Sequence, residues 1–265
     1  MYYCIYNKNK LKQQPIIEAM AKGTGGVCLE LKELDLSQVN AQQDCVVFIG
    51  LVYGMGDLYR HILANNINYI YIDHAYFTAG YSTGWFRCTR NNFIQNTIKT
   101  SNLIRPSFDQ KIRPLRRTGS YILGLPSSDA VNYIFGDAHD WYNKICDTLS
   151  QQLGLPVVHR HKSPQIVLDK RGHIQKRITH TYKTSLDLAI SGARCLVTYS
   201  SSVSIYARTQ GCPVFVHERN AAYPVGENLE TISNPPDRYL EPWIRSLSNS
   251  QFNLDEMQSG ILDRL

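Results

Sequence analysis

An acidic side chain and an imidazole stand next to each other near the end of an apolar stretch in the first half of the sequence. The stretch NYIYIDHAYF, residues 68–77, is predicted as a strand, and Asp73 and His74 follow its most apolar part. A carboxylate beside a histidine at the end of a buried strand is a favourable position for a general base. The alternative is that Asp73 only caps the turn after the strand.

The next stretch, residues 78–92, combines aromatic and basic side chains with two glycines and is predicted as a loop. Aromatic rings beside guanidinium groups suit a flat or anionic ligand, such as a sugar or a nucleotide strand. An ordinary surface loop is the alternative. The side chains expected to contact such a ligand are Tyr81, Trp85, Arg87 and Arg90.

A second group of cations follows a strand in the other half of the chain. Residues 156–159 are predicted as a strand, and Arg160 and Lys162 come directly after it. An arginine grips a phosphate with two hydrogen bonds, and a lysine acts as a point charge. The histidines of the run HRHK lack a third ligand nearby in sequence, so a metal site is not expected there.

Three serines, Ser200, Ser201 and Ser202, stand between a short apolar run at 195–197 and a helix-compatible segment. A glycine and a second β-branched run follow, and this order predicts a strand–helix–strand unit with parallel strands. The first N–H groups of a helix are unpaired and carry partial positive charge, which favours phosphate binding. The alternative is that Ser202 merely caps the helix.

These groups are positioned by two successive runs of strand–helix alternation, which predict an α/β fold of two Rossmann-like halves with an interdomain cleft. We expect an N-terminal half at 1–110, a basic solvated linker at 111–119, a second half at 120–232 and a helical tail at 233–265. Open α/β sheets bind ligands at the carboxyl ends of their strands, where the polar groups above are located.

Local patterns predict further elements within this plan. Residues 45–50, CVVFIG, indicate a strand buried on both faces. Asp57 is expected to cap the helix that follows, which extends through Leu63. Residues 137–153 have apolar side chains at helical spacing, and the basic stretch 170–183 is typical of a projecting loop or hairpin.

Composition sets broad limits on the protein. The 265 residues carry 43% hydrophobic and 19% charged side chains, which is typical of a globular protein and excludes a disordered one. A formal net charge of +6 is compatible with an anionic partner, and 17 tyrosines are available for stacking or for a solvated surface. The seven scattered cysteines form no CxxC pair and indicate reduced thiols, while no stretch is apolar enough for a membrane span.

Four stretches of the sequence resemble those of a known protein family. They are YIDHAYF (71–77), WFRCTRNNF (85–93), RCLVTYSSSVSIYARTQGCPVFV (194–216) and SNPPDRYLEPWIRSLSNSQFNLDEMQSG (233–260). With them the chain resembles two-Rossmann glycosyltransferases of the GT-B type, and among these a group of short phage-encoded glycosyltransferases. The second and fourth stretches are distinctive, whereas the serine-bearing unit recurs in many nucleotide-sugar transferases.

The resemblance implies a glycosyltransferase whose C-terminal half holds a nucleotide sugar, with a UDP-sugar as the first choice, and whose N-terminal half holds the acceptor. Phage enzymes of this type modify hydroxymethylated bases, so the implied partner is double-stranded DNA carrying them. A basic, tyrosine-rich chain suits that acceptor. Neither a metal nor a further cofactor is implied, no DxD motif is present, and the expected location is the host cytoplasm without a membrane partner.

One position departs from the family pattern. Related donor-binding helices carry a glutamate in EAxxxGxPV that grips the donor ribose. This chain has Tyr206, Ala207 and Arg208 there, which places Tyr206 against the donor and leaves the identity of the donor open.

The mechanism expected from these positions is a direct displacement. Asp73, with His74 beside it, deprotonates the acceptor hydroxyl as it attacks the anomeric carbon. Arg160, Lys162 and the N–H groups after Ser200–Ser202 offset the charge that grows on the departing diphosphate. Three alternatives remain: a nucleic-acid-binding module, a glycosyltransferase acting on a polysaccharide or a small molecule, and a nucleotide- or sugar-binding protein without turnover.

Overall fold

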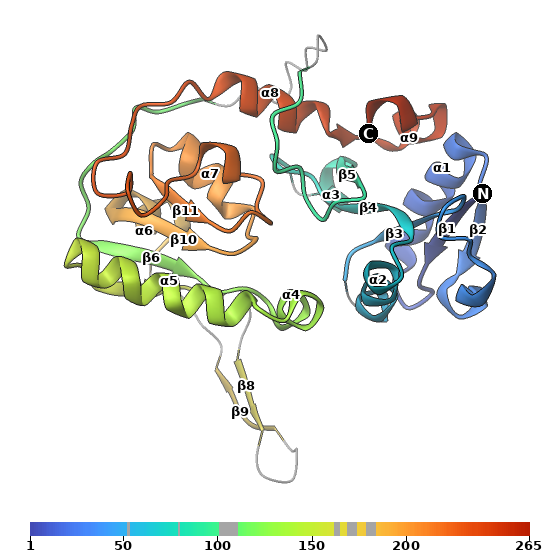
Figure 1. Ribbon diagram of the computed structural model, residues 1–265, viewed down its shortest axis with the longest axis horizontal. Coiled ribbons are helices and arrows are strands. Elements are labelled where there is room, and N and C mark those ends of the chain that lie inside the picture. The colour runs from blue at the N-terminus through green and yellow to red at the C-terminus, as the bar shows by residue number, and fades with distance from the viewer. Residues whose placement is uncertain (52–53, 79, 101–110, 162–164, 169–173, 179–183) are drawn as a thin grey trace. The chain divides into compact units, whose positions relative to one another are not determined.

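The computed structural model describes residues 1–51, 54–78, 80–100, 111–161, 165–168, 174–178 and 184–265 (Figure 1). Lys162 and the last ten residues of the predicted N-terminal half, 101–110, lie outside these residues. The chain forms two compact units. Unit 1 comprises Met1–Gln110, Tyr133–Gly136 and Glu241–Leu265, and unit 2 comprises Lys111–Asn132 and Asp137–Leu240. The segment expected as a tail is therefore divided after Leu240.

The bounds of the elements are as follows. Unit 1 contains β1 (Tyr2–Tyr6), α1 (Gln14–Thr24), β2 (Val27–Glu30), β3 (Cys45–Ile49), α2 (Met55–Ala64), β4 (Asn68–His74), α3 (Gly80–Thr83), β5 (Phe86–Arg90), α8 (Glu241–Asn249), β12 (Gln251–Phe252) and α9 (Leu254–Ser259). Unit 2 contains β6 (Tyr121–Leu125), α5 (Ala138–Leu153), β7 (Val157–His159), β8 (Gln165–Leu168), β9 (Ile174–Ile178), α6 (Leu186–Gly192), β10 (Ala193–Thr198), α7 (Val203–Thr209) and β11 (Val214–Val216). Helix α4 (Asp129–Phe135) contains residues of both units.

The sheet of unit 1 has the strand order β12-β5-β4-β3-β1-β2. Strands β1 to β4 pair in parallel, and β5 pairs antiparallel with both β4 and β12. The four parallel strands follow the order 2-1-3-4 of a doubly wound sheet, because the chain crosses back between β2 and β3. This half is Rossmann-like, as the alternation predicts.

The two faces of this sheet have different cores. On one face, apolar side chains such as Val47 and Ile72 pack with Met20 of α1 and Met257 of α9. On the other face lies a cluster of aromatic rings, in which Tyr59 and Tyr71 stack 5.8 Å apart. Its further members are Phe48, Tyr69, Phe93 and Phe135. Part of the tyrosine content therefore belongs to the core and not to a solvated surface.

The sheet of unit 2 contains four strands in the order β11-β10-β6-β7, and every neighbouring pair is parallel. In chain order this is again 2-1-3-4. Ile122, Cys195 and Val197 face α5, where they pack in one core cluster with Tyr142 and other apolar side chains of that helix. Helix α7 covers the opposite face against β10 and β11 (Figure 1). The molecule thus contains two α/β units with the same order of parallel strands.

The basic segment 111–119 lies along unit 2. The backbone N–H of Arg113 donates to the carbonyl of Thr209, and that of Arg116 to the carbonyl of Gly211, both at 2.8 Å. The guanidinium of Arg116 donates to Ile190 O at 2.6 Å. Gly211 has φ +78°, and a Cβ there would lie 2.1 Å from the carbonyl oxygen of Pro114. The close approach explains a glycine at this position. Residues 111–114 and 117–119 are exposed, so the segment is solvated while its backbone is hydrogen-bonded to the rest of unit 2.

Two local predictions are corrected. The stretch 78–92 is not one loop, because it contains α3 and the strand β5, whose Phe86 and Cys88 point into the core. Asp57 does not cap α2: Gly54, with φ +84°, is the N-cap, and Asp57 lies in the first turn, where its carboxylate accepts from the hydroxyl of Tyr133.

Other predictions are confirmed. The stretch 137–153 is helical as α5, and Gly154 ends it with φ +64°. In the basic stretch 170–183, β9 pairs antiparallel with β8, which is a hairpin. Among the described residues, every helix is too short or too polar to span a bilayer. Six cysteines are buried, whereas Cys28 on β2 is exposed.

Candidate functional site

The parallel strands of unit 2 bring their carboxyl ends to one edge of the sheet. Strands β6 and β10 are neighbours there, and the chain leaves them toward opposite sides of the strand order. This is the topological switch point, where open α/β sheets bind ligands. Thr198 at the end of β10 donates its hydroxyl to the carbonyl of Leu125 at the end of β6, 2.8 Å away. The two strand ends are thereby held together.

The loops that leave this switch point are rich in serine. Ser127 follows β6, and its Oγ is buried without a hydrogen-bond partner among the described residues. Ser200 and Ser201 follow β10 and are partly exposed. A buried hydroxyl without a partner loses its hydrogen bond to water, so a polar ligand in this position would restore one.

The serine loop starts α7 in a different way from the predicted cap. Ser202 occupies the N-cap position, but its side chain makes no capping bond. Instead, the Oγ of Ser201 accepts from the N–H of Val203 at 3.3 Å, and the carbonyl of Ser201 accepts from the hydroxyl of Ser204 at 2.8 Å. The exposed side chain of Ser202 is not used in closing the turn.

A cluster of polar and aromatic side chains lies at the same edge. Nη1 of Arg219 donates to the hydroxyl oxygen of Tyr199 at 2.8 Å, and that hydroxyl donates to Asp137 at 2.7 Å. Arg219 also lies 3.8 Å from the second carboxylate oxygen of Asp137. The ring of His217 stacks on Tyr199 at 4.1 Å, and Trp141 meets both rings edge-on.

The surroundings of this cluster favour the neutral forms of Tyr199 and His217. Burial and the hydrogen bond to Asp137 raise the pKa of Tyr199 well above its ordinary value. Burial and the charge of Arg219 lower the pKa of His217. The cluster was missed in the sequence, although the charged triplet His217–Arg219 directly after β11 is the same kind of signal as the HRHK run after β7.

The other residues predicted for the donor have mixed placements. Arg160 follows β7, two strands from β10 on the same edge, which is about 10 Å at ordinary strand spacing. Its backbone N–H donates to Gly124 O at 2.8 Å and its guanidinium to Thr184 O at 3.0 Å. Tyr206 lies in the middle of α7, where its hydroxyl donates to Asp187 at 2.6 Å. Lys162 is outside the described residues.

In unit 1, Asp73 and Arg87 form an ion pair across neighbouring strands. They face each other in the register of β4 and β5, and Nη2 of Arg87 lies 2.8 Å from Oδ2 of Asp73. The hydroxyl of Tyr71 donates to the same oxygen at 3.0 Å, and the N–H of His74 donates to Oδ1 at 2.8 Å. Each carboxylate oxygen of Asp73 therefore accepts at least one hydrogen bond.

This arrangement makes Asp73 a firmly ionised group. Burial alone would raise its pKa, but the charge of Arg87 and the hydrogen bonds from His74 and Tyr71 outweigh burial, and the pKa lies below its ordinary value. Arg87 is only 6% exposed, and its guanidinium lies within 6 Å of the centre of the Tyr76 ring. The geometry favours Arg87 as a partner of Asp73 over an exposed contact for an acceptor.

The remaining predicted residues of unit 1 divide into two places. His74 is exposed, and its ring meets the ring of Tyr81 edge-on at 5.1 Å. Trp85 directly precedes β5 and is partly buried. Arg90 pairs in register with Ile70, three residues from the pair of Arg87 with Asp73, or about 10 Å along the strand. The structure therefore brings His74 and Tyr81 together and leaves Arg90 apart.

Gly80 permits the position of His74. A Cβ at this glycine would lie 2.5 Å from Nδ1 of His74 and 3.2 Å from the ring of Phe86. Both distances are shorter than an ordinary van der Waals contact. The imidazole is thus packed directly against the backbone at the start of α3.

Among solved structures, the chain is similar to KpsC of Thermosulfurimonas dismutans, described as a beta Kdo 2,4 transferase. The two are 10% identical with a TM-score of 0.45, and the match covers 92% of this chain and 89% of that one. No protein-family model and no curated protein matches the chain. At this level of similarity the comparison does not assign an activity.

The candidate residues of unit 1 and of unit 2 offer different chemistry. The edge of unit 2 offers hydroxyl groups and the guanidinium of Arg219, which are suited to an anionic ligand, whereas the first N–H groups of α7 are bonded to the serine loop. The edge of unit 1 offers an exposed imidazole, His74, beside an ionised carboxylate. Within the described residues, no group of three or more His, Cys, Asp or Glu side chains could hold a metal ion.

Proposed function

We propose that the protein is a glycosyltransferase and that unit 2 binds the nucleotide-sugar donor at the carboxyl ends of β6 and β10. The observation that carries the proposal is the buried, unpartnered hydroxyl of Ser127 at the switch point of a parallel sheet. A diphosphate oxygen placed there would accept this hydrogen bond. The sequence motifs that resemble GT-B enzymes support the same assignment, with a UDP-sugar as the first donor to test.

Arg219 has the main electrostatic role in this proposal. Its side chain is 35% exposed, and Tyr199 and Asp137 fix its position at the edge of the sheet. A fixed guanidinium stabilises negative charge that develops on a departing diphosphate without further reorganisation. Arg160, on the same edge, adds a second cation. The ring stack of Tyr199 and His217 offers a flat apolar surface for the nucleoside part of the donor.

In unit 1 the proposed base is His74, and Asp73 accepts a hydrogen bond from its backbone N–H. A carboxylate whose pKa is lowered by an ion pair is a weak acceptor of protons, whereas histidine is the side chain most often used as a general base. His74 takes the proton from the acceptor hydroxyl while the oxygen of that hydroxyl forms the bond to the anomeric carbon. The bond from that carbon to the diphosphate breaks, and the diphosphate leaves with the electron pair.

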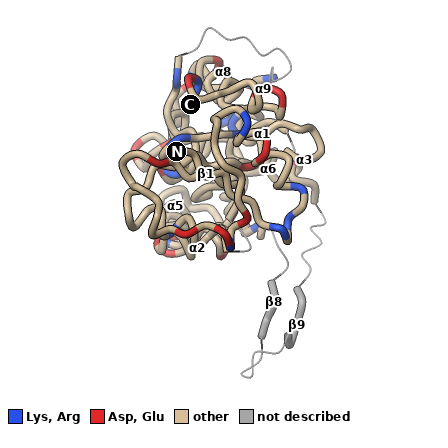
Figure 2. Tube along the Cα trace, turned by 90° about the vertical axis from the view of Figure 1, so that its right-hand side faces the viewer, with Lys and Arg blue, Asp and Glu red and all other residues tan. Residues whose placement is uncertain are grey.

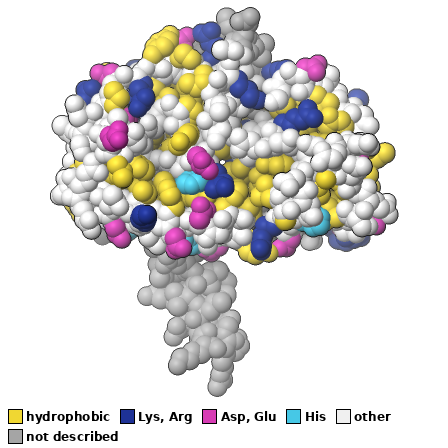
Figure 3. Space-filling model, in the orientation of Figure 1, with side chains coloured by type: hydrophobic (Ala, Val, Ile, Leu, Met, Phe, Trp, Pro, Cys, Tyr) yellow, Lys and Arg dark blue, Asp and Glu magenta, His cyan; other side chains and the backbone are white. Residues whose placement is uncertain are grey.

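For the acceptor we propose a hydroxymethylated pyrimidine in double-stranded DNA. The net charge of +6 and the exposed ring of Tyr81 near His74 support a polyanionic, flat acceptor. The burial of Arg87 removes one cation from the acceptor site. On the face drawn in Figure 3, cationic side chains stand among acidic and hydrophobic ones, and Figure 2 shows both signs of charge distributed along the chain. A polysaccharide hydroxyl is therefore the acceptor to compare.

Thermal-shift measurements with a panel of nucleotide sugars test donor binding. We expect one donor to raise the melting temperature, because a ligand that binds only the native state stabilises it. Ser127→Ala and Arg219→Gln should weaken this effect, and His74→Gln, in the other unit, is the matched control that should keep it. A panel without any stabilising nucleotide sugar would refute the proposed function.

The acceptor is tested separately with the donor found in this way. Release of the nucleoside diphosphate is measured with hydroxymethylated duplex DNA, with unmodified duplex DNA and with an oligosaccharide. Transfer to the first alone supports the DNA assignment. Transfer to the oligosaccharide alone would retain the glycosyltransferase and replace its acceptor.

A further inference from the structure

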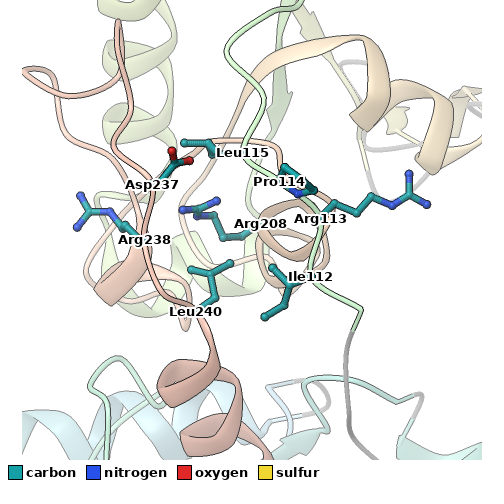
Figure 4. Close-up of a pocket in the computed structure, with 8 residues that line it drawn as sticks. All are labelled: Ile112, Arg113, Pro114, Leu115, Arg208, Asp237, Arg238 and Leu240. Atoms are coloured by element: carbon teal, nitrogen blue, oxygen red, sulfur yellow. The ribbon is translucent and has the colours of Figure 1, made fainter.

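A small cavity in unit 2 lies away from the edge described above. Its volume is about 220 Å³, and its lining comes from three segments: 112–115, α7 and 237–240. The lining includes the apolar residues Ile112, Leu115 and Leu240, and Arg208 lies between Leu115 and the other two (Figure 4). Arg208 is near the end of α7, whereas the serine loop begins this helix. The cavity and the candidate donor site are thus separated by the length of α7, about 10 Å.

Arg208 is a buried cation that lacks a full set of partners. It is 1% exposed, its Nε donates to the carbonyl of Val225 at 3.3 Å, and its Nη2 is buried without a hydrogen-bond partner in the described part of the chain. Burial lowers its pKa, although arginine stays protonated. Figure 4 shows its guanidinium turned toward Asp237 and Leu115. A buried charge without compensation is costly, which makes an anion in this cavity favourable.

The acidic groups nearby do not fully compensate Arg208. Among the described residues, no carboxylate forms an ion pair with it within 4.0 Å. The carboxylate of Glu227 is completely buried, and its nearest cation is Arg238 at 3.6 Å. Asp237 pairs with Arg117 at 3.2 Å. Glu227 is the strongest opposite charge acting on Arg208, but the ion pairs of both acids are with other arginines, and Nη2 of Arg208 keeps no hydrogen-bond partner among the described residues.

From this geometry we infer that the cavity binds a small oxyanion, with inorganic phosphate or a phosphate monoester as its chemical class. Nη2 of Arg208 would donate to one oxygen of the anion, and the apolar side chains would contact a short organic group if one is present. The volume is below the range of about 300–1,000 Å³ typical of pockets for larger ligands, so a whole nucleotide sugar does not fit.

The position of this cavity gives the bound anion a structural role. Segment 112–115 lies just after the chain enters unit 2 at Lys111, and segment 237–240 lies just before it leaves at Leu240. The two segments are more than a hundred residues apart in sequence and line the same cavity. An anion that contacts Arg208 between them would hold both segments in place.

Calorimetric titration of the full chain tests this inference, with inorganic phosphate, glycerol 1-phosphate and acetate as probes. We expect both phosphates to bind, and Arg208→Met to weaken their binding about 10- to 100-fold, as loss of a charged hydrogen bond predicts. Arg245→Met is the matched control, because Arg245 is exposed on α8 in unit 1 and pairs with Glu241. Binding only to acetate would overturn the proposed ligand class.

Two further variants keep the test decisive. The side chain of Asp237 is 75% exposed, so the variant Asp237→Asn should fold. Because the substitution removes a negative charge near the cavity, it should tighten phosphate binding about 2- to 5-fold. Arg219→Gln, in the candidate donor site, should leave unchanged the phosphate binding that is weakened in Arg208→Met. Two results would place the anion elsewhere and refute the inference independently of the proposed function. One is loss of that binding in Arg219→Gln, and the other is unchanged phosphate binding in both Asp237→Asn and Arg208→Met.

Discussion

The guanidinium of Arg87 lies 2.8 Å from the carboxylate of Asp73, and the two residues face each other across β4 and β5. Arg87 is the more buried partner, with 7% of its side chain exposed against 29% for Asp73. Loss of the carboxylate therefore leaves a buried cation, whereas loss of the cation leaves a carboxylate that water can reach.

This asymmetry predicts an unusual pair of stabilities. Asp73→Asn should destabilise the protein by about 2–3 kcal/mol, because Arg87 remains buried without its charged partner. Adding Arg87→Met should recover part of this loss, since an apolar side chain fits among the surrounding rings. Urea unfolding of the single and double variants measures both effects. A double variant less stable than Asp73→Asn would contradict this account.

The proposed base can be separated from donor binding. His74→Gln should lower the transfer rate roughly 10²- to 10⁴-fold, the contribution typical of a positioned general base. Donor affinity should stay unchanged, because His74 lies in unit 1 and the proposed donor site in unit 2. Single-turnover kinetics with titrated donor check both numbers. Full activity in His74→Gln would remove this residue from the mechanism.

His217 predicts a dependence of stability on pH. Its folded pKa is lowered by burial and by Arg219, so the fold favours the neutral imidazole over the charged one. This stabilisation is present above the ordinary value of 6.5 and is lost as the pH falls below it through the lowered pKa. When the pH falls from about 7 to about 5, the free energy of unfolding should therefore decrease less in His217→Gln than in the native protein. Urea unfolding across this range measures the difference, and equal losses would contradict the shift.

Two glycines test how tightly segment 111–119 lies against unit 2. Gly211 and Gly154 both have positive φ, but only Gly211 has a backbone atom, the Pro114 oxygen, in the place of a Cβ. Gly154→Ala should cost about 1–2 kcal/mol from its φ alone. Gly211→Ala should cost about 1–3 kcal/mol more, because backbone must move. Equal losses in thermal unfolding would show that the segment is only loosely held.

The sequence predicted the parts of the fold that depend on local patterns. Continuous apolar runs such as 45–49 and 121–125 are the central parallel strands, and the serine-bearing unit has the predicted strand–helix–strand order. Strand β5 was missed because Arg87 and Thr89 alternate with its two core residues, so a buried polar position looked like a loop. Its burial depends on pairing with β12, which is far away in the sequence.

The candidate site was predicted less completely than the fold. His74, Arg160 and the serines are at strand ends, as expected from their order along the chain. The cluster of Tyr199, Asp137 and Arg219 joins a strand end, a helix start and a loop, and no local spacing connects these three positions. The packing of α5 against β10 and the pairing of β10 with β11 bring them together.

The exposure of Cys28 on β2 sets it apart from the six buried cysteines. A thiol reagent applied to the native protein meets one accessible sulfur atom, and that atom lies on an edge strand of unit 1. A single fluorophore or spin label can therefore be attached to the natural sequence without removing any other cysteine.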